Sequence, residues 1–217
     1  MSKNFKGYMG DQIGKLGTAV GRRWKGKMVY SAYQGKVSNP NTEAQQLVRA
    51  RFAVLGKMAS AFLSTLQLGL KRWAVRLRLT EGDVFVKTNY AAVEGESADA
   101  LTVGYDQLAV AQGPLTGVQF GSAVFTTPLT PTVPIAEGNV GVDGAKSDDK
   151  VYLVAYSPDK QKAVRSTTPV SRSDANATVS VPASWQGLKV HLYGFVQSAS
   201  DKTLVSDSEY IGFGNIG

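Results

Sequence analysis

The run Lys189-Val-His-Leu-Tyr-Gly-Phe-Val196 points most clearly to the fold of this 217-residue chain. β-Branched and aromatic residues dominate it, and this composition is typical of a β-strand. Seven further runs of the same kind recur at intervals of roughly ten residues, separated by Gly, Pro, Asp and Ser. These runs are Leu101–Tyr105, Leu108–Ala111, Val118–Phe125, Val151–Tyr156, Val164–Val170, Ala177–Val181 and Glu209–Phe213. The pattern predicts an immunoglobulin-like β-sandwich, here without a disulfide because the chain contains no cysteine.

The opening of the chain is rich in glycine instead. Each glycine inside a helix costs about 1 kcal/mol relative to alanine, so we expect an extended arm with turns. The glycines of this segment are Gly7, Gly10, Gly14, Gly17, Gly21, Gly26 and Gly35. Within it, Val20–Trp24 and Met28–Tyr33 flank Lys25-Gly26, which predicts a β-hairpin with a tight turn.

An amphipathic helix is predicted from Thr42 to about Gln67. Thr42 and Gln45 have the spacing of a capping box, and apolar residues follow at helical intervals. We expect this helix to bend near Gly56. The next segment, 71–80, is ambiguous: its apolar and basic residues alternate from residue 75, which favours a strand with one basic face, with a continued helix as the alternative.

Two other segments complete the predicted organisation. The proline-rich segment Pro128–Pro134 is extended and is not expected in the middle of a sheet, because proline lacks an N–H donor. The stretch Ala92–Ala100 is acidic and poor in apolar residues, so it marks the predicted domain boundary. The predicted fold class is therefore α+β, mostly β. Residues 1–98 form a basic, glycine-rich arm with a hairpin and an amphipathic helix, and residues 99–217 form the sandwich.

The net charge of +7 is unevenly distributed. Residues 1–80 contain fifteen Lys and Arg against two acidic residues, which gives +13. Residues 81–217 contain nine Lys and Arg against fifteen acidic residues, which gives −6. Such asymmetry indicates how the chain meets partners, and it does not determine the fold.

Tryptophans are interleaved with the cations of the basic half. Such clusters neutralise phosphates and stack on bases, or they meet an acidic face of a neighbouring subunit. The predicted contact residues are Arg22, Arg23, Trp24, Lys25, Lys27, Arg49, Arg51, Lys71, Arg72, Trp73, Arg76 and Arg78.

Residue types that support catalysis or metal binding are scarce. The single histidine, His191, shares a predicted strand face with two aromatic residues and is interpreted as a packing residue. No cysteine or second histidine is present to complete a catalytic triad or a zinc site. Asp143, Asp148 and Asp149 lack the spacing of a calcium-binding loop and are interpreted as a solvated turn. We therefore predict a protein that is not an enzyme, with no cofactor and no metal site.

Several motifs are spread over nearly the whole chain. They are Gly17–Tyr30, Asn39-Pro-Asn-Thr-Glu-Ala-Gln-Gln46 with Arg49 and Phe52, Leu68-Gly69-Leu70, Tyr105–Leu108, Gly113-Pro114-Leu115 and Val205–Gly212. Together they resemble an uncharacterised family of Bacteroidota genomes and their phages, from which no catalytic residue carries over. The resemblance implies a phage or mobile-element context. Residues 125–142 depart from the family pattern, because a proline-rich segment stands where the pattern has an aromatic-bearing strand.

Assembly is the function that the charge asymmetry favours. The basic half of one copy is expected to pack on the acidic half of the next, head to tail. In a phage context this predicts a virion component (head, connector or tail) that forms a homo-oligomer or binds other virion proteins, in the host cytoplasm and in the virion. The alternative is non-specific nucleic-acid binding through the basic half.

A hydrolase or carbohydrate-active sandwich is a third hypothesis, which no pair of carboxylates in the sequence supports. No membrane contact is predicted, since polar residues interrupt the longest apolar stretch, Phe52–Leu70.

Overall fold

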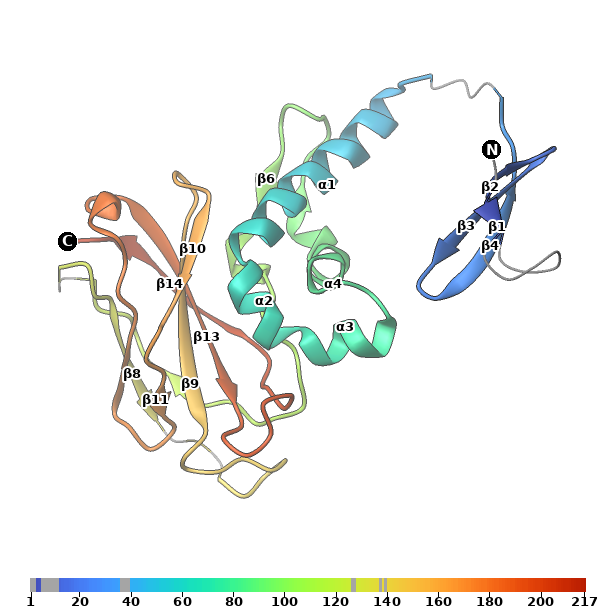
Figure 1. Ribbon diagram of the computed structural model, residues 1–217. Coiled ribbons are helices and arrows are strands. Elements are labelled where there is room, and N and C mark those ends of the chain that lie inside the picture. The colour runs from blue at the N-terminus through green and yellow to red at the C-terminus, as the bar shows by residue number, and fades with distance from the viewer. Residues whose placement is uncertain (1–2, 5–11, 36–39, 126–127, 137, 139) are drawn as a thin grey trace. The chain divides into compact units, whose positions relative to one another are not determined.

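The computed structural model describes residues 3–4, 12–35, 40–125, 128–136, 138 and 140–217 (Figure 1). Its fold is mixed α and β, with more strand than helix. Contacts divide the chain into two units, Met1–Thr42 and Glu43–Gly217. The boundary predicted near residue 98 falls instead inside the second unit, where helices and sheet share a core. Gly7 and Gly10 of the predicted arm, and Asn39 of the family motif, lie outside the described residues.

The first unit forms a four-stranded antiparallel sheet with its strands in sequence order. They are β1 (Lys3–Asn4), β2 (Gln12–Leu16), β3 (Ala19–Trp24) and β4 (Lys27–Ala32). β3 and β4 confirm the predicted hairpin. Between them, Lys25 and Gly26 have φ angles of 47° and 77°. Two successive left-handed residues make the tight turn whose twist matches that of the flanking strands.

This sheet buries little of its own surface. Among the residues described in β2, β3 and β4, only Gly21 is buried, and a Cβ there would collide with the carbonyl oxygen of Gln12. Leu16, Trp24 and Tyr30 are 48%, 59% and 52% exposed. A small sheet that exposes apolar side chains on both faces gains little stability from burial.

Four helices open the second unit: α1 (Glu43–Ala61), α2 (Leu63–Gly69), α3 (Lys71–Leu77) and α4 (Glu81–Thr88). α1 and α2 confirm a helical segment over residues 42–67, but the bend predicted near Gly56 is wrong. The helix axis instead turns by 83° at the break between α1 and α2, where Phe62 lies. Phe62 is fully buried and stacks on Tyr156, with ring centroids 4.9 Å apart. Packing against the sheet therefore sets the bend, and the weak helix propensity of glycine does not.

The strand favoured over residues 75–80 is also wrong, and the alternative of a further helix is closer to the structure. Ala74 of α3 is buried, whereas Val75 is 73% exposed. The alternating apolar residues therefore do not mark a buried strand face. Arg78 ends α3 in the left-handed conformation, with a φ of 55°.

Two antiparallel sheets follow the helices. The larger has the order β10 (Lys162–Arg165), β9 (Lys150–Ser157), β13 (Lys189–Gln197) and β14 (Glu209–Asn215), with β11 (Val170–Ser171) also paired to β9. The smaller has the order β12 (Asn176–Thr178), β8 (Thr132–Ala136) and β7 (Gln119–Phe120). A separate hairpin pairs β5 (Val93–Glu94) with β6 (Thr102–Val103). Short 3₁₀ turns occupy Tyr90–Ala92, Tyr105–Gln107 and Ala183–Trp185.

β9 and β13 are the centre of this unit, because both are buried on both faces. One core joins them to the helices, and its strand residues are Val154, Tyr156, Tyr193 and Phe195. A second core joins them to the smaller sheet, and its β9 and β13 residues are Val151, Leu153, Ala155, Val190, Leu192 and Val196. Helices, larger sheet and smaller sheet therefore form three layers (Figure 1). The two sheets share a core, and an immunoglobulin-like strand order stays a prediction.

Most predicted strands have a counterpart, but no strand forms at Leu108–Ala111. Asn89, buried at the end of α4, replaces a neighbouring strand there. Its Oδ1 accepts from the N–H of Ala109 at 2.7 Å. Its Nδ2 donates to the carbonyls of Ala109 and Phe85, at 3.0 and 2.9 Å. The Asn89 side chain thus satisfies the backbone of Ala109, and Ser208 pairs with the next two residues. Its Oγ accepts from the N–H of Val110 at 2.9 Å, and its N–H donates to the carbonyl of Ala111 at 3.0 Å.

The proline-rich segment also differs from expectation. Pro134 lies in β8, the middle strand of the smaller sheet, which corrects the prediction that this segment stays out of a central ladder. The pairing of β7 stops at Phe120 and resumes at a bridge between Val124 and Thr132. The missing N–H therefore falls at a local interruption of the ladder, where proline is tolerated.

Candidate interaction surface

Cations of the N-terminal sheet share one face with a tryptophan. Strand pairing aligns Arg22 with Val29 and Trp24 with Lys27. Because alternate residues of a strand point to the same side, Arg22, Trp24 and Lys27 occupy one face and Arg23 the other. The side chains of all four are exposed.

Two further cations extend this face. Lys15 pairs with Val20, on the same side as Arg22, and its Nζ lies 3.6 Å from the ring centroid of Tyr33. Lys25 in the turn places its Nζ 5.0 Å from the centroid of the Trp24 ring. We term this set the basic sheet face: Lys15, Arg22, Trp24, Lys25, Lys27 and Tyr33. Sequence reasoning missed Lys15 because it assigned an arm, without strand register, to the residues before the hairpin. It placed Tyr33 in the hairpin but gave it no contact role.

The two predicted cations of α1 do not act together. Arg51 donates from Nη2 to the carbonyl of Gly95 at 3.0 Å, and its guanidinium lies 5.7 Å from the centroid of the Tyr90 ring. Arg51 therefore fixes the β5–β6 hairpin to α1. Arg49 is exposed in the first half of the helix.

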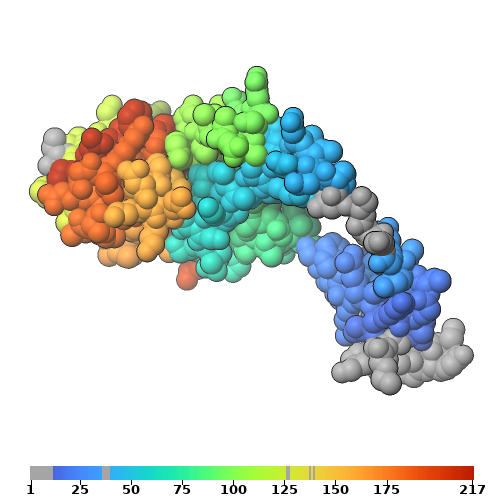
Figure 2. Space-filling model, turned by 90° about the horizontal axis from the view of Figure 1, so that it is seen from above, coloured from blue at the N-terminus to red at the C-terminus, as the bar shows by residue number. Residues whose placement is uncertain are grey.

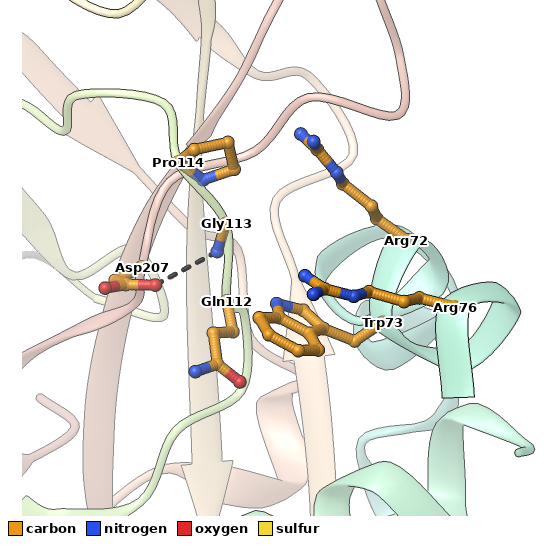
Figure 3. Close-up of a pocket in the computed structure, with 7 residues that line it drawn as sticks. All are labelled: Arg72, Trp73, Arg76, Gln112, Gly113, Pro114 and Asp207. Atoms are coloured by element: carbon orange, nitrogen blue, oxygen red, sulfur yellow. Dashed lines mark hydrogen bonds between the residues drawn. The ribbon is translucent and has the colours of Figure 1, made fainter.

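The predicted cations of α3 line a pocket of about 310 Å³ (Figure 3). Arg72, Trp73 and Arg76 project from the helix toward the segment Gln112–Pro114. The guanidinium of Arg76 lies 5.1 Å from the centroid of the Trp73 ring, which positions it over an aromatic face. Lys71 and Arg78, at the two ends of the helix, are exposed.

The opposite wall of the pocket is held by backbone contacts. Oδ1 of Asp207 accepts from the N–H of Gly113 at 3.0 Å (Figure 3). A Cβ on Gly113 would collide with the carbonyl oxygen of Val205, so only glycine fits there. Sequence reasoning missed the lining residues 112–114 and Asp207 as a site. Most of them belong to motifs on which the family resemblance rests, but the sequence assigns these motifs no site.

The charge of Arg72 also affects a nearby carboxylate. Asp201 is exposed and accepts hydrogen bonds from the hydroxyl and the N–H of Thr203, at 2.7 and 2.8 Å. These bonds lower the pKa of the Asp201 carboxyl, and the positive charge of Arg72 lowers it further. The pocket therefore has cations on the helix side and the Asp207 carboxylate on the opposite wall, and Asp201 lies within range of the charge of Arg72.

His191 is a buried packing residue, as predicted. Its ring stacks on Tyr105 with centroids 4.2 Å apart, and its Nδ1 lies 2.9 Å from the hydroxyl oxygen of Tyr210. Burial lowers the pKa of the imidazole to about 4, and the nearby charge of Lys189 acts in the same direction. The side chain is therefore neutral at pH 7.

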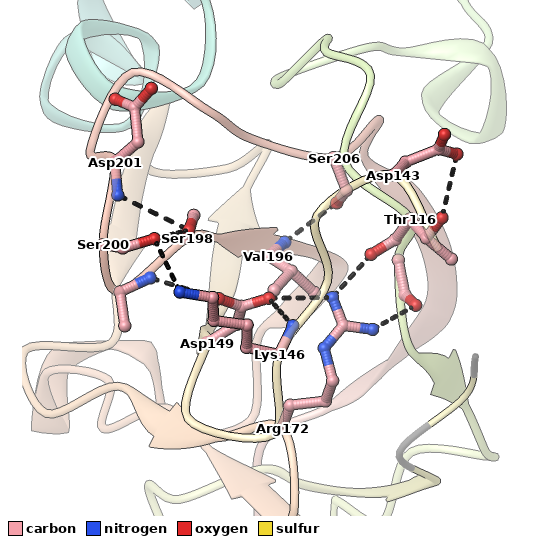
Figure 4. Close-up of polar contacts among 12 residues, drawn as sticks. Thr116, Asp143, Lys146, Asp149, Arg172, Val196, Ser198, Ser200, Asp201 and Ser206 are labelled. Atoms are coloured by element: carbon pink, nitrogen blue, oxygen red, sulfur yellow. Dashed lines mark hydrogen bonds and ion pairs between the residues drawn. The ribbon is translucent and has the colours of Figure 1, made fainter. Parts of the chain in front are cut away.

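The solvated turn expected at Asp143, Asp148 and Asp149 is wrong for Asp149. That side chain is fully buried and forms an ion pair with the equally buried Arg172, Oδ2 to Nη2 at 3.4 Å (Figure 4). It also accepts from the N–H of Lys146 at 2.8 Å. Asp143 and Asp148 are exposed. No group of three or more metal-ligating side chains gathers in the described part of the chain.

The twelve predicted contact residues thus fall on three elements. Five lie on the N-terminal hairpin, two on α1, and five on α3 and the residue that ends it. The structure gathers four of the hairpin residues in the basic sheet face and three of the α3 residues around one pocket. Arg51 is separate, since it holds a hairpin within its own unit.

Over the described residues, no single helix has the length and apolar character needed to cross a membrane. α1 and α2 meet that criterion only as a pair with an 83° bend between them. The buried residues of α1 are Leu55, Met58 and Ala59, and all three belong to the core shared with the sheet.

Comparison with known proteins gives a family and no function. No curated protein and no solved structure matches the chain. Residues 10–212 match the model of a family described as a family of unknown function, DUF6266. This match confirms the resemblance to an uncharacterised family. Because it covers nearly the whole sequence, the chain belongs to the family of unknown function DUF6266.

Proposed function

We propose that this protein is a non-enzymatic structural protein that assembles head to tail with further copies of itself. One observation carries the proposal: the N-terminal sheet is strongly basic and exposes its apolar and aromatic side chains. Residues 1–42 contain eight Lys and Arg against one Asp, so this unit carries the whole net charge of +7. Residues 43–217 contain sixteen basic and sixteen acidic residues.

A partner surface would supply the apolar contacts and the negative charge that the sheet lacks. Trp24 and Tyr30 are more than half exposed, and strand register places them on opposite faces, so both faces of the sheet offer aromatic surface to a partner. The counter-charge is available on a second copy, because residues 81–217 carry −6. A contact between two different surfaces of one chain repeats from copy to copy and produces rings or filaments.

The predictions of an immunoglobulin-like sandwich and of a virion component belong to this proposal. In it, the first unit acts as the docking arm, and the two sheets that share a core act as an immunoglobulin-like sandwich. The phage context implied by the motif resemblance makes a head, connector or tail protein of a virion the setting for such assembly. Other virion proteins are then further partners.

Salt-dependent association tests the proposal. Light scattering of the full chain at low and at high salt is expected to show oligomers that dissociate as salt rises, since screening weakens contacts between exposed charges. Replacing Arg22, Arg23, Lys25 and Lys27 by Gln removes four cations and is expected to reduce association. A matched control replaces Lys57, Lys87, Lys160 and Lys162, which are exposed elsewhere. A monomer under every condition contradicts the proposal.

Non-specific nucleic-acid binding is the second candidate, and the basic sheet face favours it. Arg22 and Lys27 flank Trp24 on one exposed face, and that combination suits phosphates together with stacked bases. Mobility shifts with unrelated DNA sequences over a salt series separate the two candidates. In this alternative the four Gln substitutions weaken DNA binding equally for all sequences and reduce its salt dependence.

A further inference from the structure

We infer that the α3 pocket receives the acidic β5–β6 hairpin of a second copy of this chain. The inference rests on the proposed assembly and adds a second contact between copies, made by two surfaces of the second unit. The pocket is lined by Arg72, Trp73 and Arg76. The hairpin is the segment 93–103, whose tip is Glu94-Gly-Glu-Ser-Ala-Asp-Ala100.

The arginine side chains on one wall of the pocket suit a carboxylate ligand. Arg72 and Arg76 are exposed, and no acidic residue lies between Lys71 and Arg78. A guanidinium presents a planar set of donors that matches a carboxylate with two parallel hydrogen bonds. Trp73 is half-buried and supports the guanidinium of Arg76 at 5.1 Å, which reduces the freedom lost when a ligand binds.

The hairpin offers the complementary charge on a fixed frame. Glu94, Glu96 and Asp99 are all exposed, and residues 93–103 contain no Lys or Arg. Nη2 of Arg51 donates a hydrogen bond to the carbonyl of Gly95 at 3.0 Å. Gly95 has a φ of 151°, and a Cβ there would collide with the carbonyl oxygen of Ala100. The tip is therefore pre-organised, and little ordering is needed on binding.

The helix α3, which carries the arginines of the pocket, and the β5–β6 hairpin lie at opposite ends of the helical layer of the second unit (Figure 1). The segment near residue 100 projects from the surface, as the green knob of Figure 2 shows. A contact between the hairpin and the pocket therefore joins two different copies. Because one contact leaves an unused pocket on one copy and an unused hairpin on the other, the contact propagates.

A protein hairpin fits the pocket better than a nucleic acid does. Asp207 lines the wall opposite the two arginines, so the pocket is cationic on one side only. A polyphosphate strand would place negative charge along its whole length, beside that carboxylate as well. A hairpin with separated carboxylates meets the arginines and presents backbone N–H groups elsewhere.

Charge reversal with mixing tests the inference. Arg72→Glu with Arg76→Glu destroys the pocket, and Glu96→Lys with Asp99→Lys destroys the hairpin. Each variant alone is expected to associate at least about tenfold more weakly than the wild type. Each variant retains one intact surface, and the two reversed surfaces are again opposite in charge, so a one-to-one mixture is expected to regain association, measured by light scattering. Lys160→Glu with Lys162→Glu is the matched control at another exposed site, and thermal melting checks that all variants fold.

Cross-linking gives an independent readout, because the chain contains no cysteine. Pro114→Cys and Ser97→Cys in one chain place a thiol at the pocket and a thiol on the hairpin tip. Oxidation is expected to produce a ladder of disulfide-linked oligomers, and either single variant is expected to produce none above a dimer.

The outcomes separate the inference from the proposed function. If the wild type associates in a salt-dependent way and both charge-reversed variants match it, the pocket inference is wrong and assembly stands. If the wild type is always monomeric, assembly fails and the inference fails with it. Loss of DNA binding in Arg72→Glu/Arg76→Glu with unchanged self-association would show that the pocket takes phosphate, and this result also overturns the inference.

Discussion

At the scale of the residue, Arg172 forms an ion pair and several hydrogen bonds in the interior of the second unit. Its side chain is fully buried and donates to the carbonyls of Thr116 and Gly117 at 2.6 and 2.8 Å, as well as pairing with Asp149 (Figure 4). Arg172→Met leaves the Asp149 carboxylate buried without its cation. We expect a loss of about 3–5 kcal/mol in the free energy of unfolding, measured by urea denaturation. Adding Asp149→Asn is expected to restore part of that loss, and simple additivity of the two substitutions would contradict the coupling.

His191 makes the stability of the protein depend on pH. Its pKa of about 4 in the folded state lies below the ordinary value of 6.5, so the unfolded chain binds more protons between these two values. Stability is therefore full above pH 6.5 and falls as the pH drops from 6.5 toward 4, by ~3 kcal/mol in total. His191→Phe keeps the stack on Tyr105 and removes the titration. Urea denaturation at pH 7 and pH 4.5 is expected to show a smaller difference for this variant than for the wild type, and an equal difference would rule His191 out as the cause.

At the scale of the element, α4 depends on Thr80, the N-cap residue that precedes it. The hydroxyl of Thr80 accepts from the N–H of Asp83 at 3.1 Å, and the carboxylate of Asp83 accepts from the N–H of Thr80 at 3.2 Å. Thr80→Ala removes half of this capping box and is expected to cost ~1 kcal/mol of stability in urea denaturation. Thr88→Ala, exposed at the other end of α4, is the control and is expected to cost less. Equal losses would show that the cap contributes nothing specific.

The elements that the sequence predicts well are those whose signals are local. The turn at Lys25-Gly26 needs left-handed residues and gives the hairpin its register without help from the rest of the chain. The end of α1 is different, because Phe62 breaks the helix to pack on a strand almost a hundred residues away. The same holds for the segment 108–111, whose backbone pairs with the side chain of Asn89 and with Ser208. Periodicity contains no information about such distant partners, and it therefore misplaces the bend and adds a strand.

At the scale of the whole molecule, composition shows where charged residues lie in the sequence but not which contacts their side chains make. The sequence assigns the excess of cations to residues 1–80, and within that range Arg51 holds a backbone carbonyl whereas Arg72 and Arg76 line a pocket. The opposite wall of that pocket comes from residues 112–114 and Asp207. Two walls that lie so far apart in sequence meet only through the packing of helices on the sheet. A window of sequence therefore finds the cations and misses the pocket.

The division into two units gives a last prediction about the intact chain. Both hydrophobic cores consist of residues from 55 to 216, so a chain shortened to residues 43–217 is expected to fold. Its melting temperature in calorimetry should stay within about 3 °C of that of the full chain, because a unit without a core contributes less than about 1 kcal/mol to the other. Its net charge falls from +7 to zero, so retention on a cation-exchange column should be lost. The full chain with Arg22, Arg23, Lys25 and Lys27 replaced by Gln is the control, which retains the sheet and is expected to elute between the two. A drop of more than about 10 °C on truncation would instead mean that the basic sheet is an integral support of the three-layered unit, and an assembly role for it would lose its physical basis.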